Sequence, residues 1–403
     1  MMRVLFIDDD TNILDGLRRT LRSMRESWHM EFVSSAREAL AAFAMAPFDV
    51  VVSDMRMPEM DGAELLTTIM ERHSPTIRIV LSGHADTATI MKSVGIAHQF
   101  LSKPCTPETL QKTIKRACAL KALIESEAVQ GAVAGLRRLP TVPSLYRELV
   151  HCLRSDDATL DTVAKIIGQD IGMTTRILQL ASSAFFGLPK SVSTVDRAVA
   201  YLGLDTVGSL VLSQGAFGSY APAELHGFDV EALMRRGMRT AAIARAIAKL
   251  DNCDKQTVER VFLAGMLHDV GCLVLAAELP QKYAELTARS AVPGADVRAI
   301  EREVFGVSHA FVGAYLLGLW ALPTAIVEAV AYHEEPSACA ANDWSAFGIV
   351  HVASRIAAHP SCEDVDDTSL PLDRDYLQRV GVLHRWPEWR AAAAELQTED
   401  ATA

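Results

Sequence analysis

Hydrophobic residues follow two different patterns along the chain, and the pattern changes after Pro107. In the first part, short continuous apolar runs alternate with stretches in which apolar residues recur every three or four positions. Continuous apolar runs are typical of strands buried on both faces, and the three-to-four spacing is typical of amphipathic helices. The apolar runs are Val4–Ile7, Phe48–Ser53, Ile77–Ser82 and Gln99–Leu101, and the helical stretches are Thr11–Met24, Ala36–Ala44, Ala63–Arg72 and Asp86–Val94. Strands that alternate with helices predict a doubly wound α/β domain with a parallel sheet, whose functional groups lie in loops at the carboxyl ends of the strands.

The pattern after Pro107 is almost entirely helical. One long helical stretch runs from Glu108 to about Gly131, and glycines and prolines up to Pro143 then place a domain boundary near residues 130–140. Helical spacing continues through Leu145–Leu153, Leu160–Gly168, Met173–Ala181, Ala232–Leu250, Val258–Leu275, Val297–Glu303, Ala310–Leu319 and Ala325–His333, with a further helix expected at Asp375–Leu383. We therefore expect four segments: an α/β domain over 1–122, a helical linker over 123–139, an all-α domain over 140–360 and a partly helical C-terminal extension over 361–403.

Composition and charge limit the classes of function. The chain has 403 residues, of which 50% are hydrophobic and 22% charged, so it can bury a substantial core and is not disordered as a whole. The net charge of −11 and the scattered arginine doublets, which no aromatic residues accompany, argue against a nucleic-acid surface. No charge-free apolar run reaches the ~18 residues of a membrane span, and aspartates interrupt the apolar start, so we expect a cytoplasmic protein without membrane contact. The seven cysteines include no Cys-x-x-Cys pair and are expected to be reduced thiols.

Acidic residues gather at the expected carboxyl ends of two strands. Asp8, Asp9 and Asp10 follow the first apolar run, and Asp54 follows Val50–Ser53. Because such ends can lie side by side in a parallel sheet, the carboxylates are expected to meet, and their mutual repulsion calls for a cation. Oxygen ligands suit Mg²⁺, and a carboxylate beside that ion is a reasonable nucleophile for forming an aspartyl-phosphate.

Two further polar residues follow later strands. Ser82 could donate a hydroxyl at this pocket, and Lys103, which precedes Pro104, could place an ammonium on phosphoryl oxygens. Any one aspartate after a strand is more often a helix cap or a turn residue. Six such groups at consecutive strand ends are poorly explained in that way, so we interpret them as one phosphoryl-transfer site.

These residues resemble the motifs of the receiver domain of two-component response regulators. The resemblance implies a flavodoxin-like five-stranded sheet and transfer of a phosphoryl group from the phosphohistidine of a partner sensor histidine kinase to Asp54. It also implies that Mg²⁺ is held by Asp9, Asp54 and the backbone carbonyl of Arg56, with Asp8 acting mainly through water. The resemblance covers about residues 1–120 and rests on Ile7–Asp10, Asp54–Gly62, Leu81–His84 and Lys103-Pro104.

The same resemblance implies how the signal leaves the domain. Ser82 and Lys103 would sense the phosphoryl group, and Phe100 would occupy the aromatic switch position, although a core phenylalanine on the last strand is an equally good interpretation. Phosphorylation would rearrange the face formed by the fourth helix, the last strand and the last helix. The apolar spacing of the helix that continues from Glu108 suggests that it passes this change to the second domain or to a second copy of the chain in a homodimer.

Histidines supply the candidate chemistry of the second domain. His268 and Asp269 lie together in an apolar helical stretch, and such a pair can bind a divalent metal when further imidazoles or carboxylates join it. His309 and His333, which Glu334 follows, are further candidates. A lone histidine on an apolar helix is more often a hydrogen-bonded core residue.

The second domain resembles the HDOD family, a helical output module related to HD-type metal phosphohydrolases. The resemblance covers roughly residues 137–355 and rests on segments that are diffuse singly and specific together. These segments are Leu139–Pro143, Ile167–Asp170, Ser182–Gly187, Tyr201–Leu204, Glu301–Ala314 and Trp320–His333.

Departures from the catalytic HD relatives argue against a metal. These relatives have a histidine early in the domain, and this chain has Arg236 at that position. They have an aspartate as the last residue of the site, and this chain has Ser354 there. Their paired histidines are reduced to His333-Glu334, and no Gly-Tyr-Pro follows. A guanidinium places a permanent cation where a metal dication would lie. We therefore expect no metal at the degenerate HD site formed by Arg236, His268, Asp269, His309, His333 and Ser354, with His268 and Asp269 kept as a buried hydrogen-bonded pair.

The sequence thus predicts a response regulator that is not an enzyme. A sensor histidine kinase phosphorylates Asp54, and a catalytically degenerate HDOD module then signals to an unknown downstream protein by protein–protein interaction. The alternative is a receiver-gated, metal-dependent phosphohydrolase or phosphodiesterase of the HD superfamily. Direct binding of DNA is disfavoured because the sequence contains no recognisable helix-turn-helix or basic reading helix.

Overall fold

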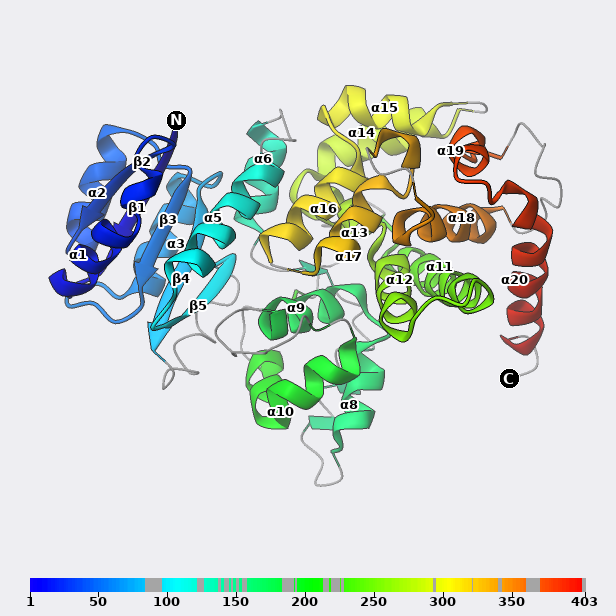
Figure 1. The fold of residues 1–403 in the computed structure, drawn as a ribbon, viewed down its shortest axis with the longest axis horizontal. Helices are drawn as coiled ribbons and strands as arrows, with labels where there is room; N and C mark the ends of the chain where they lie inside the picture. Colours follow the sequence, from blue (N-terminus) through cyan, green and yellow to red (C-terminus); the bar gives the residue numbers. More distant parts are fainter. Residues whose placement is uncertain are drawn as a thin grey trace.

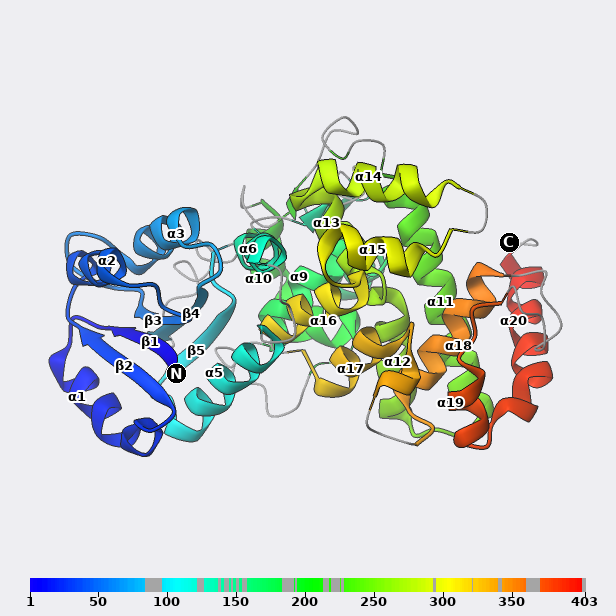
Figure 2. The ribbon, with the colours of Figure 1, turned by 90° about the horizontal axis from the view of Figure 1, so that it is seen from above.

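The N-terminal domain is a parallel five-stranded sheet with helices on both faces (Figures 1 and 2). The computed structural model describes residues 1–83, 96–121, 127–136, 139–140, 158–182, 194–212, 217–218, 228–292, 295–320, 322–339, 343–359 and 370–400, with positions 145, 148–149, 152–153, 192 and 225 between them. The strands are β1 (Met2–Ile7), β2 (Trp28–Val33), β3 (Val50–Asp54), β4 (Ile77–Gly83) and β5 (Gln99–Lys103), in spatial order β2-β1-β3-β4-β5. The predicted doubly wound α/β fold is confirmed.

Strand β2 has no counterpart among the apolar runs of the sequence. Its residues, Trp28–Val33, pair only with β1 at the edge of the sheet, and most of them are partly exposed. An edge strand buries fewer of its side chains, so His29 and Glu31 interrupt the apolar run by which the inner strands are recognised.

The helices of this domain begin at polar residues that cap them. They are α1 (Thr11–Thr20, followed by a 3₁₀ turn at Arg22–Met24), α2 (Ala36–Met45), α3 (Gly62–Arg72) and α5 (Pro107–Lys121). The side chains of Asp10, Ser35 and Asp61 accept hydrogen bonds from backbone N–H groups in the first turns of α1, α2 and α3. The helix expected at Asp86–Val94 lies outside the described residues.

The second domain is built from helices that pack around a central pair, α11 and α12. The continuous segment Lys255–Glu278, which contains α12 and α13, is apolar and long enough to cross a membrane, but 83% of its apolar window is buried within the structure. It is a core element of the helical domain, and the predicted all-α class is confirmed. The helices are α8 (Leu160–Ile167), α9 (Ile171–Ser182), α10 (Val195–Leu212), α11 (Val230–Leu250), α12 (Lys255–Leu267), α13 (Val270–Glu278), α14 (Pro280–Ser290), α15 (Val297–Phe305), α16 (His309–Leu319), α17 (Thr324–Tyr332) and α18 (Ala346–Ala358).

Helices α5 and α6 (Glu127–Gly135) lie between the sheet and the helical domain (Figure 2). The structure describes them as two helices where the sequence suggested a single long one. Helix α5 packs against α16, and α6 packs against α3, α13 and α16. The apolar residues Leu110, Ile114 and Ala117 of α5 are all buried. These three residues, which are part of the apolar spacing from which we expect a homodimer, are therefore covered within the chain itself.

The C-terminal extension closes over the end of α11. It contains α19 (Arg374–Arg379), a 3₁₀ turn at Leu383–Arg385 and α20 (Trp386–Asp400), and α20 packs against α11. The rings of Trp344 and Trp389 stack with their centroids 5.0 Å apart, and both indole N–H groups donate to the carboxylate of Asp251, at 2.6 and 3.3 Å. Arg385 forms an ion pair with the same carboxylate, so one aspartate anchors the extension.

Replacement of Trp389 by alanine should therefore destabilise the helical domain. The indole is fully buried, and its loss removes the stacking partner of Trp344 as well as a hydrogen bond to Asp251. We expect the free energy of unfolding to fall by about 3–5 kcal/mol in urea titrations followed by circular dichroism. Tyr201→Ala, at a half-exposed aromatic residue of α10, is the control and should stay within about 0.5 kcal/mol of the parent. Equal effects of the two variants would show that α20 does not stabilise this domain.

Candidate functional site

Asp8, Asp54 and Lys103 meet at the carboxyl edge of the sheet. Strand β1 ends at Ile7 and pairs there with Ser53 of β3, which brings Asp8 beside Asp54. Lys103 ends β5, and its Nζ lies 2.7 Å from Asp8 Oδ2 and forms an ion pair with Asp54 Oδ1. Asp8 and Asp54 are both buried, so one ammonium compensates two carboxylates that have little access to water.

The backbone around Asp54 fixes its carboxylate. Asp54 Oδ2 accepts a hydrogen bond of 2.7 Å from the backbone N–H of Arg56, and Asp8 Oδ1 accepts one of 3.1 Å from that of Asp10. Gly62 opens α3 directly against this strand end: a Cβ at that position would lie 2.2 Å from the carbonyl oxygen of Asp54. Only glycine allows this approach.

Burial and the ion pairs have opposite effects on the pKa values of Asp8 and Lys103. Burial raises the pKa of Asp8, although the hydrogen bond and charge of Lys103 oppose that rise. Burial also works against the charged form of Lys103, but its hydrogen bonds to Asp54 and Asp8 outweigh burial and raise the pKa of the ammonium. Lys103 is therefore held as a cation that faces both carboxylates.

The remaining residues expected at this pocket are distributed around it. Asp9 is exposed beside Asp8, and Arg56, whose carbonyl was expected to hold Mg²⁺, is exposed just after β3. Ser82 follows the residue that pairs with Asp54, but its side chain lies outside the described part. Phe100 is buried in the sheet on β5, 1% exposed. A cleft of about 500 Å³ opens beside Lys103, with walls from α1 and from the segment between β5 and α5.

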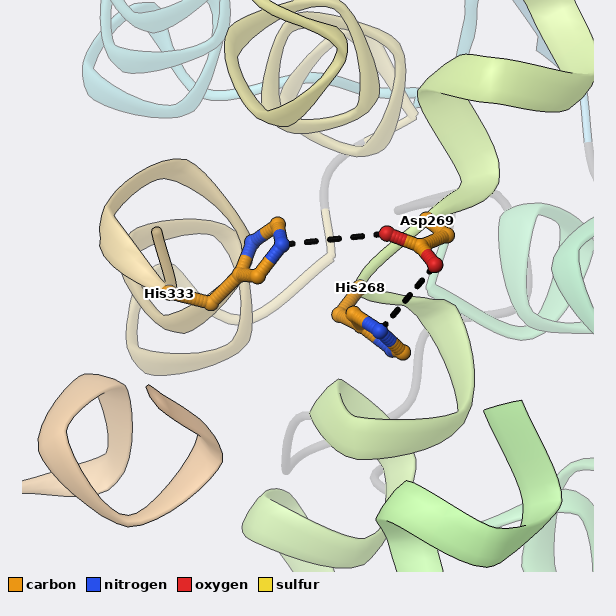
Figure 3. A group of neighbouring side chains, drawn as sticks. All are labelled: His268, Asp269 and His333. Carbon is orange, nitrogen blue, oxygen red and sulfur yellow. Dashed lines mark ion pairs between the residues drawn. The ribbon is translucent and has the colours of Figure 1, made fainter. Parts of the chain in front are cut away.

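Four elements of the helical domain bring a second set of polar side chains together. His268 and Asp269 occupy the junction of α12 and α13, His309 begins α16, and His333 follows α17. Figure 3 shows one ion pair from each oxygen of the Asp269 carboxylate, to His268 and to His333, and the centroids of these two rings lie 5.0 Å apart. The Nε2 atom of His268 lies 3.2 Å from Asp269 Oδ2, and those of His309 and His333 lie 3.1 and 3.7 Å from Asp269 Oδ1. We call His268, Asp269, His309 and His333 the HD cluster.

Each imidazole of the HD cluster is oriented through its other nitrogen. Nδ1 of His268 lies 2.7 Å from the carbonyl oxygen of Gly265, and Nδ1 of His333 lies 2.8 Å from that of Val330. Nδ1 of His309 lies 3.0 Å from the carboxylate of Glu301. These acceptors place a proton on every Nδ1 and turn all three Nε2 atoms toward Asp269.

Glu301 and Cys272 join the HD cluster although the sequence analysis did not single them out. Glu301 is 3% exposed, and it also accepts the backbone N–H of His309 at 2.9 Å. The sequence contains one indication that Glu301 is buried: it lies four residues before Phe305, on the same face of α15. Cys272 lies one turn after Asp269 and close to both Asp269 and His309.

Arg236 of α11 supplies a fixed cation to the HD cluster. Its Nε lies 2.6 Å from Asp269 Oδ2, and about half of its side chain is exposed. Burial alone would raise the pKa of Asp269, but the charges of His268 and Arg236 hold that pKa well below its usual range. Burial works against protonation of His309, but the neighbouring Cys272 and Glu301 raise the pKa of this imidazole well above its usual value. Burial and the other two imidazoles lower the pKa of His333, so this ring is neutral.

Comparison with known proteins gives both parts of the chain a family. Residues 4–115 match the model of the response regulator receiver domain, and residues 139–336 match that of the HDOD domain. The chain is a receiver domain followed by an HDOD domain. This combination is that of a response regulator with an HD-related output domain.

Known relatives match parts of the chain. An uncharacterised protein of Treponema pallidum is 27% identical over 197 residues, which are 48% of this chain and 37% of that protein. The hydrogenase transcriptional regulatory protein HoxA of Cupriavidus necator is 38% identical over 130 residues, 32% of this chain and 25% of that protein. The chain thus spans well under half of the length of these two curated relatives. Among solved structures, the MmoQ response regulator of Methylococcus capsulatus is 25% identical with a TM-score of 0.47, and the match covers 62% of this chain and 98% of that one.

Ser354 does not contribute to the HD cluster. Its hydroxyl donates to the carbonyl oxygen of His351 at 2.8 Å, within helix α18 of the HDOD domain. Nδ1 of His351 lies 2.7 Å from the carbonyl oxygen of His333, and its Nε2 accepts the backbone N–H of Asp373 at 2.9 Å. Burial lowers the pKa of His351 to about 3, so this neutral ring joins α18 to the end of α17 and to the start of α19.

The donor set of the HD cluster fits a metal in spacing but not in charge. The separations of 3.1 and 3.7 Å between Asp269 Oδ1 and two imidazole Nε2 atoms bracket the edge of about 3.3 Å of a four-coordinate zinc site. His309, however, has a carboxylate at each nitrogen, which favours a proton on both. Arg236 and a protonated His309 then supply positive charge beside Asp269 and Glu301. The HD cluster therefore combines the spacing of a metal site with a guanidinium beside its carboxylate.

Arg236→Met should destabilise the HDOD domain by roughly 1–3 kcal/mol, because it leaves the buried carboxylate of Asp269 without its guanidinium. The matched control is Arg235→Met at the next position, where the side chain is 68% exposed and its ion pairs are long. The control should lie within about 0.5 kcal/mol of the parent in the same urea titration. Identical curves for the two variants would contradict a structural role for Arg236.

Proposed function

We propose that this chain is a response regulator phosphorylated on Asp54 by a sensor histidine kinase in the cytoplasm. Its HDOD domain then acts without catalysis, by binding a downstream protein. The observation that carries the first part is the buried group of Asp8, Asp54 and Lys103 at the carboxyl edge of the sheet. The apolar cleft beside Lys103, between α1 and the start of α5, supplies a surface for the kinase.

The geometry suits attack by Asp54 on a phosphohistidine. An oxygen of the Asp54 carboxylate forms the new bond to phosphorus while the bond from phosphorus to the imidazole nitrogen of the kinase breaks, and the imidazole leaves with that electron pair. The N–H of Arg56 and the ammonium of Lys103 keep the carboxylate aligned before attack. Lys103 then has phosphoryl oxygens within its reach in place of the carboxylate that has reacted.

The oxygen-rich edge of the pocket fits Mg²⁺. Asp8, Asp9 and Asp54, with the backbone carbonyl of Arg56, are the groups that would hold the ion, because hard carboxylate and carbonyl oxygens are its preferred protein ligands. The ion supplies charge neutralisation for the incoming phosphoryl oxygens. Two buried carboxylates that share one ammonium leave a net negative charge for such a cation to balance.

Incubation with acetyl phosphate and Mg²⁺ should add one phosphoryl group to the protein, as measured by intact mass spectrometry. Asp54→Asn should abolish the mass gain because the amide is not a nucleophile for this transfer. Asp15→Asn, at an exposed aspartate of α1, is the control and should be labelled like the parent. A parent protein whose mass stays unchanged while a positive control is labelled would refute the phosphoacceptor role.

The non-catalytic role of the HDOD domain is supported by the ion pair between Arg236 and Asp269. A hydrolytic HD site needs a metal that activates water. Here Asp269 Oδ2 is already neutralised by a permanent cation, and His309 lies between two carboxylates. The cluster thereby links α11, α12, α13, α15, α16 and α17 through ion pairs.

A second candidate function is a receiver-gated, metal-dependent phosphohydrolase or phosphodiesterase. One observation favours it: the Nε2 atoms of His268, His309 and His333 converge on a single carboxylate. Arg236 weighs against it, and we place it second for that reason.

Metal content separates the two candidates. The parent protein should purify with much less than one equivalent of transition metal, as measured by inductively coupled plasma mass spectrometry. Arg236→His should bind metal more tightly, because it removes a fixed charge beside Asp269 and adds an imidazole. Arg235→His, one position away, should not. One equivalent of metal in the parent, with hydrolysis of cyclic dinucleotides that His268→Ala abolishes, would establish the second candidate instead.

A further inference from the structure

Helix α16 runs from the HD cluster to the receiver. Its first residue is His309, and its last is Leu319 at the receiver interface. The eleven residues span about 16 Å. Nine of them, from Ala310 to Leu319 apart from Phe311, are buried, so the helix is enclosed along its length.

The receiver end of α16 is joined to β5 by a buried side chain. Nε2 of Gln99 donates to the carbonyl oxygen of Leu319, and Gln99 is 5% exposed. Gln99 begins β5, and Lys103, which pairs with Asp54, ends it. The strand between them spans about 13 Å. One strand therefore connects the phosphoacceptor pocket to the end of α16.

A second contact joins the same two regions through α9. Nε2 of Gln179 donates to the carbonyl oxygen of Ala97, two residues before β5, at 3.3 Å. The Oε1 of Gln179 accepts from Arg176 at 3.0 Å, and the guanidinium of Arg176 lies 4.6 Å from the ring centroid of Trp320, which follows α16. All of these side chains are buried. Two sets of buried side chains therefore contact the end of α16. Gln99 of the receiver contacts it directly, and Arg176 contacts it from α9, where Gln179 also reaches the receiver backbone.

At its other end, α16 packs directly against the backbone of α13, because glycines at this contact carry no side chain. A Cβ on Gly271 would lie 1.9 Å from the carbonyl oxygen of His309, and one on Gly313 would lie 3.1 Å from the backbone nitrogen of Gly271. Backbones in such direct contact cannot slide past each other without a shift of both helices. Because Asp269 immediately precedes α13, a displacement of α16 moves His309 and Asp269 relative to Arg236.

We infer that α16 transmits phosphorylation of Asp54 to the HD cluster, with Gln99 as the positioning residue at the receiver end. This inference rests on the proposed phosphorylation and adds the path by which it acts. A coupling free energy is reciprocal, so the state of the HD cluster also changes the phosphorylation equilibrium of the receiver. The inference is specific because it assigns the receiver end of the path to one side chain, Gln99, which donates to the last carbonyl oxygen of α16.

Hydrogen exchange of the full chain, with and without acetyl phosphate and Mg²⁺, tests this path. Mass spectrometry of peptides reports exchange in β5 and α5, in α16 and in α13, and the intact mass of the same sample reports phosphorylation. In the parent, phosphorylation should change exchange at least about threefold in both the receiver peptides and α16. In Gln99→Ala, the receiver peptides should respond as in the parent, while the response of α16 is lost.

The matched control is Gln281→Ala, at an exposed glutamine near the start of α14, which should behave like the parent. Should Gln99→Ala fail to fold, Gln179→Ala replaces it, because that variant interrupts the second contact and leaves the hydrogen bond to Leu319 in place; its α16 response should be reduced. A parent that gains no phosphoryl mass refutes the proposed function. A parent that is phosphorylated and responds only in the receiver overturns the inference, as does an undiminished α16 response in Gln99→Ala.

Discussion

A buried carboxylate must have a cation close to it, and this requirement organises both halves of the molecule. In the receiver, Lys103 compensates Asp8 and Asp54, and in the HDOD domain Arg236 compensates Asp269. The two cations differ in kind. An ammonium on a flexible stem can turn from a carboxylate to a phosphoryl oxygen, whereas a guanidinium holds its partner through a planar, permanently charged group. The first arrangement permits exchange of partners during a reaction, and the second stabilises one geometry.

The interface between the domains depends on the same kind of constraint. Arg78 and His98, at the start of β4 and just before β5, both contact the carbonyl oxygen of Ala134 in α6, and both are buried. Together with the hydrogen bond from Gln99 to Leu319, they join the receiver to α6 and to the end of α16 through buried polar groups. Separation of the domains would have to replace each of these contacts by water. These contacts therefore favour the observed relative orientation of the domains.

The sequence predicted most of this fold because its inner strands and its helices follow simple periodicities. It missed β2, whose edge position leaves polar residues such as His29 and Glu31 in the strand. At the HD cluster it identified the residues of one short motif and two isolated histidines, but not Glu301, which approaches His309 from a different helix. Nor could it show that Ser354 donates its hydroxyl to its own helix. Residues that meet only through helix packing have no shared spacing in the chain, so pattern analysis cannot associate them.

Packing within the chain accounts for the apolar spacing of α5 over its described residues. Leu110, Ile114 and Ala117 have the spacing of a helix that buries one face, and the structure buries that face within the chain while α5 also packs against α16. A second copy of the chain cannot use these three side chains without unfolding the receiver, since they form part of its core. Helix α5 therefore contacts the HDOD domain of the same chain directly, and a signal carried by α5 reaches that domain first. The direct packing of α5 on α16 makes an intramolecular route shorter than one through a dimer, and it leaves the outer surface of the HDOD domain available for a partner protein.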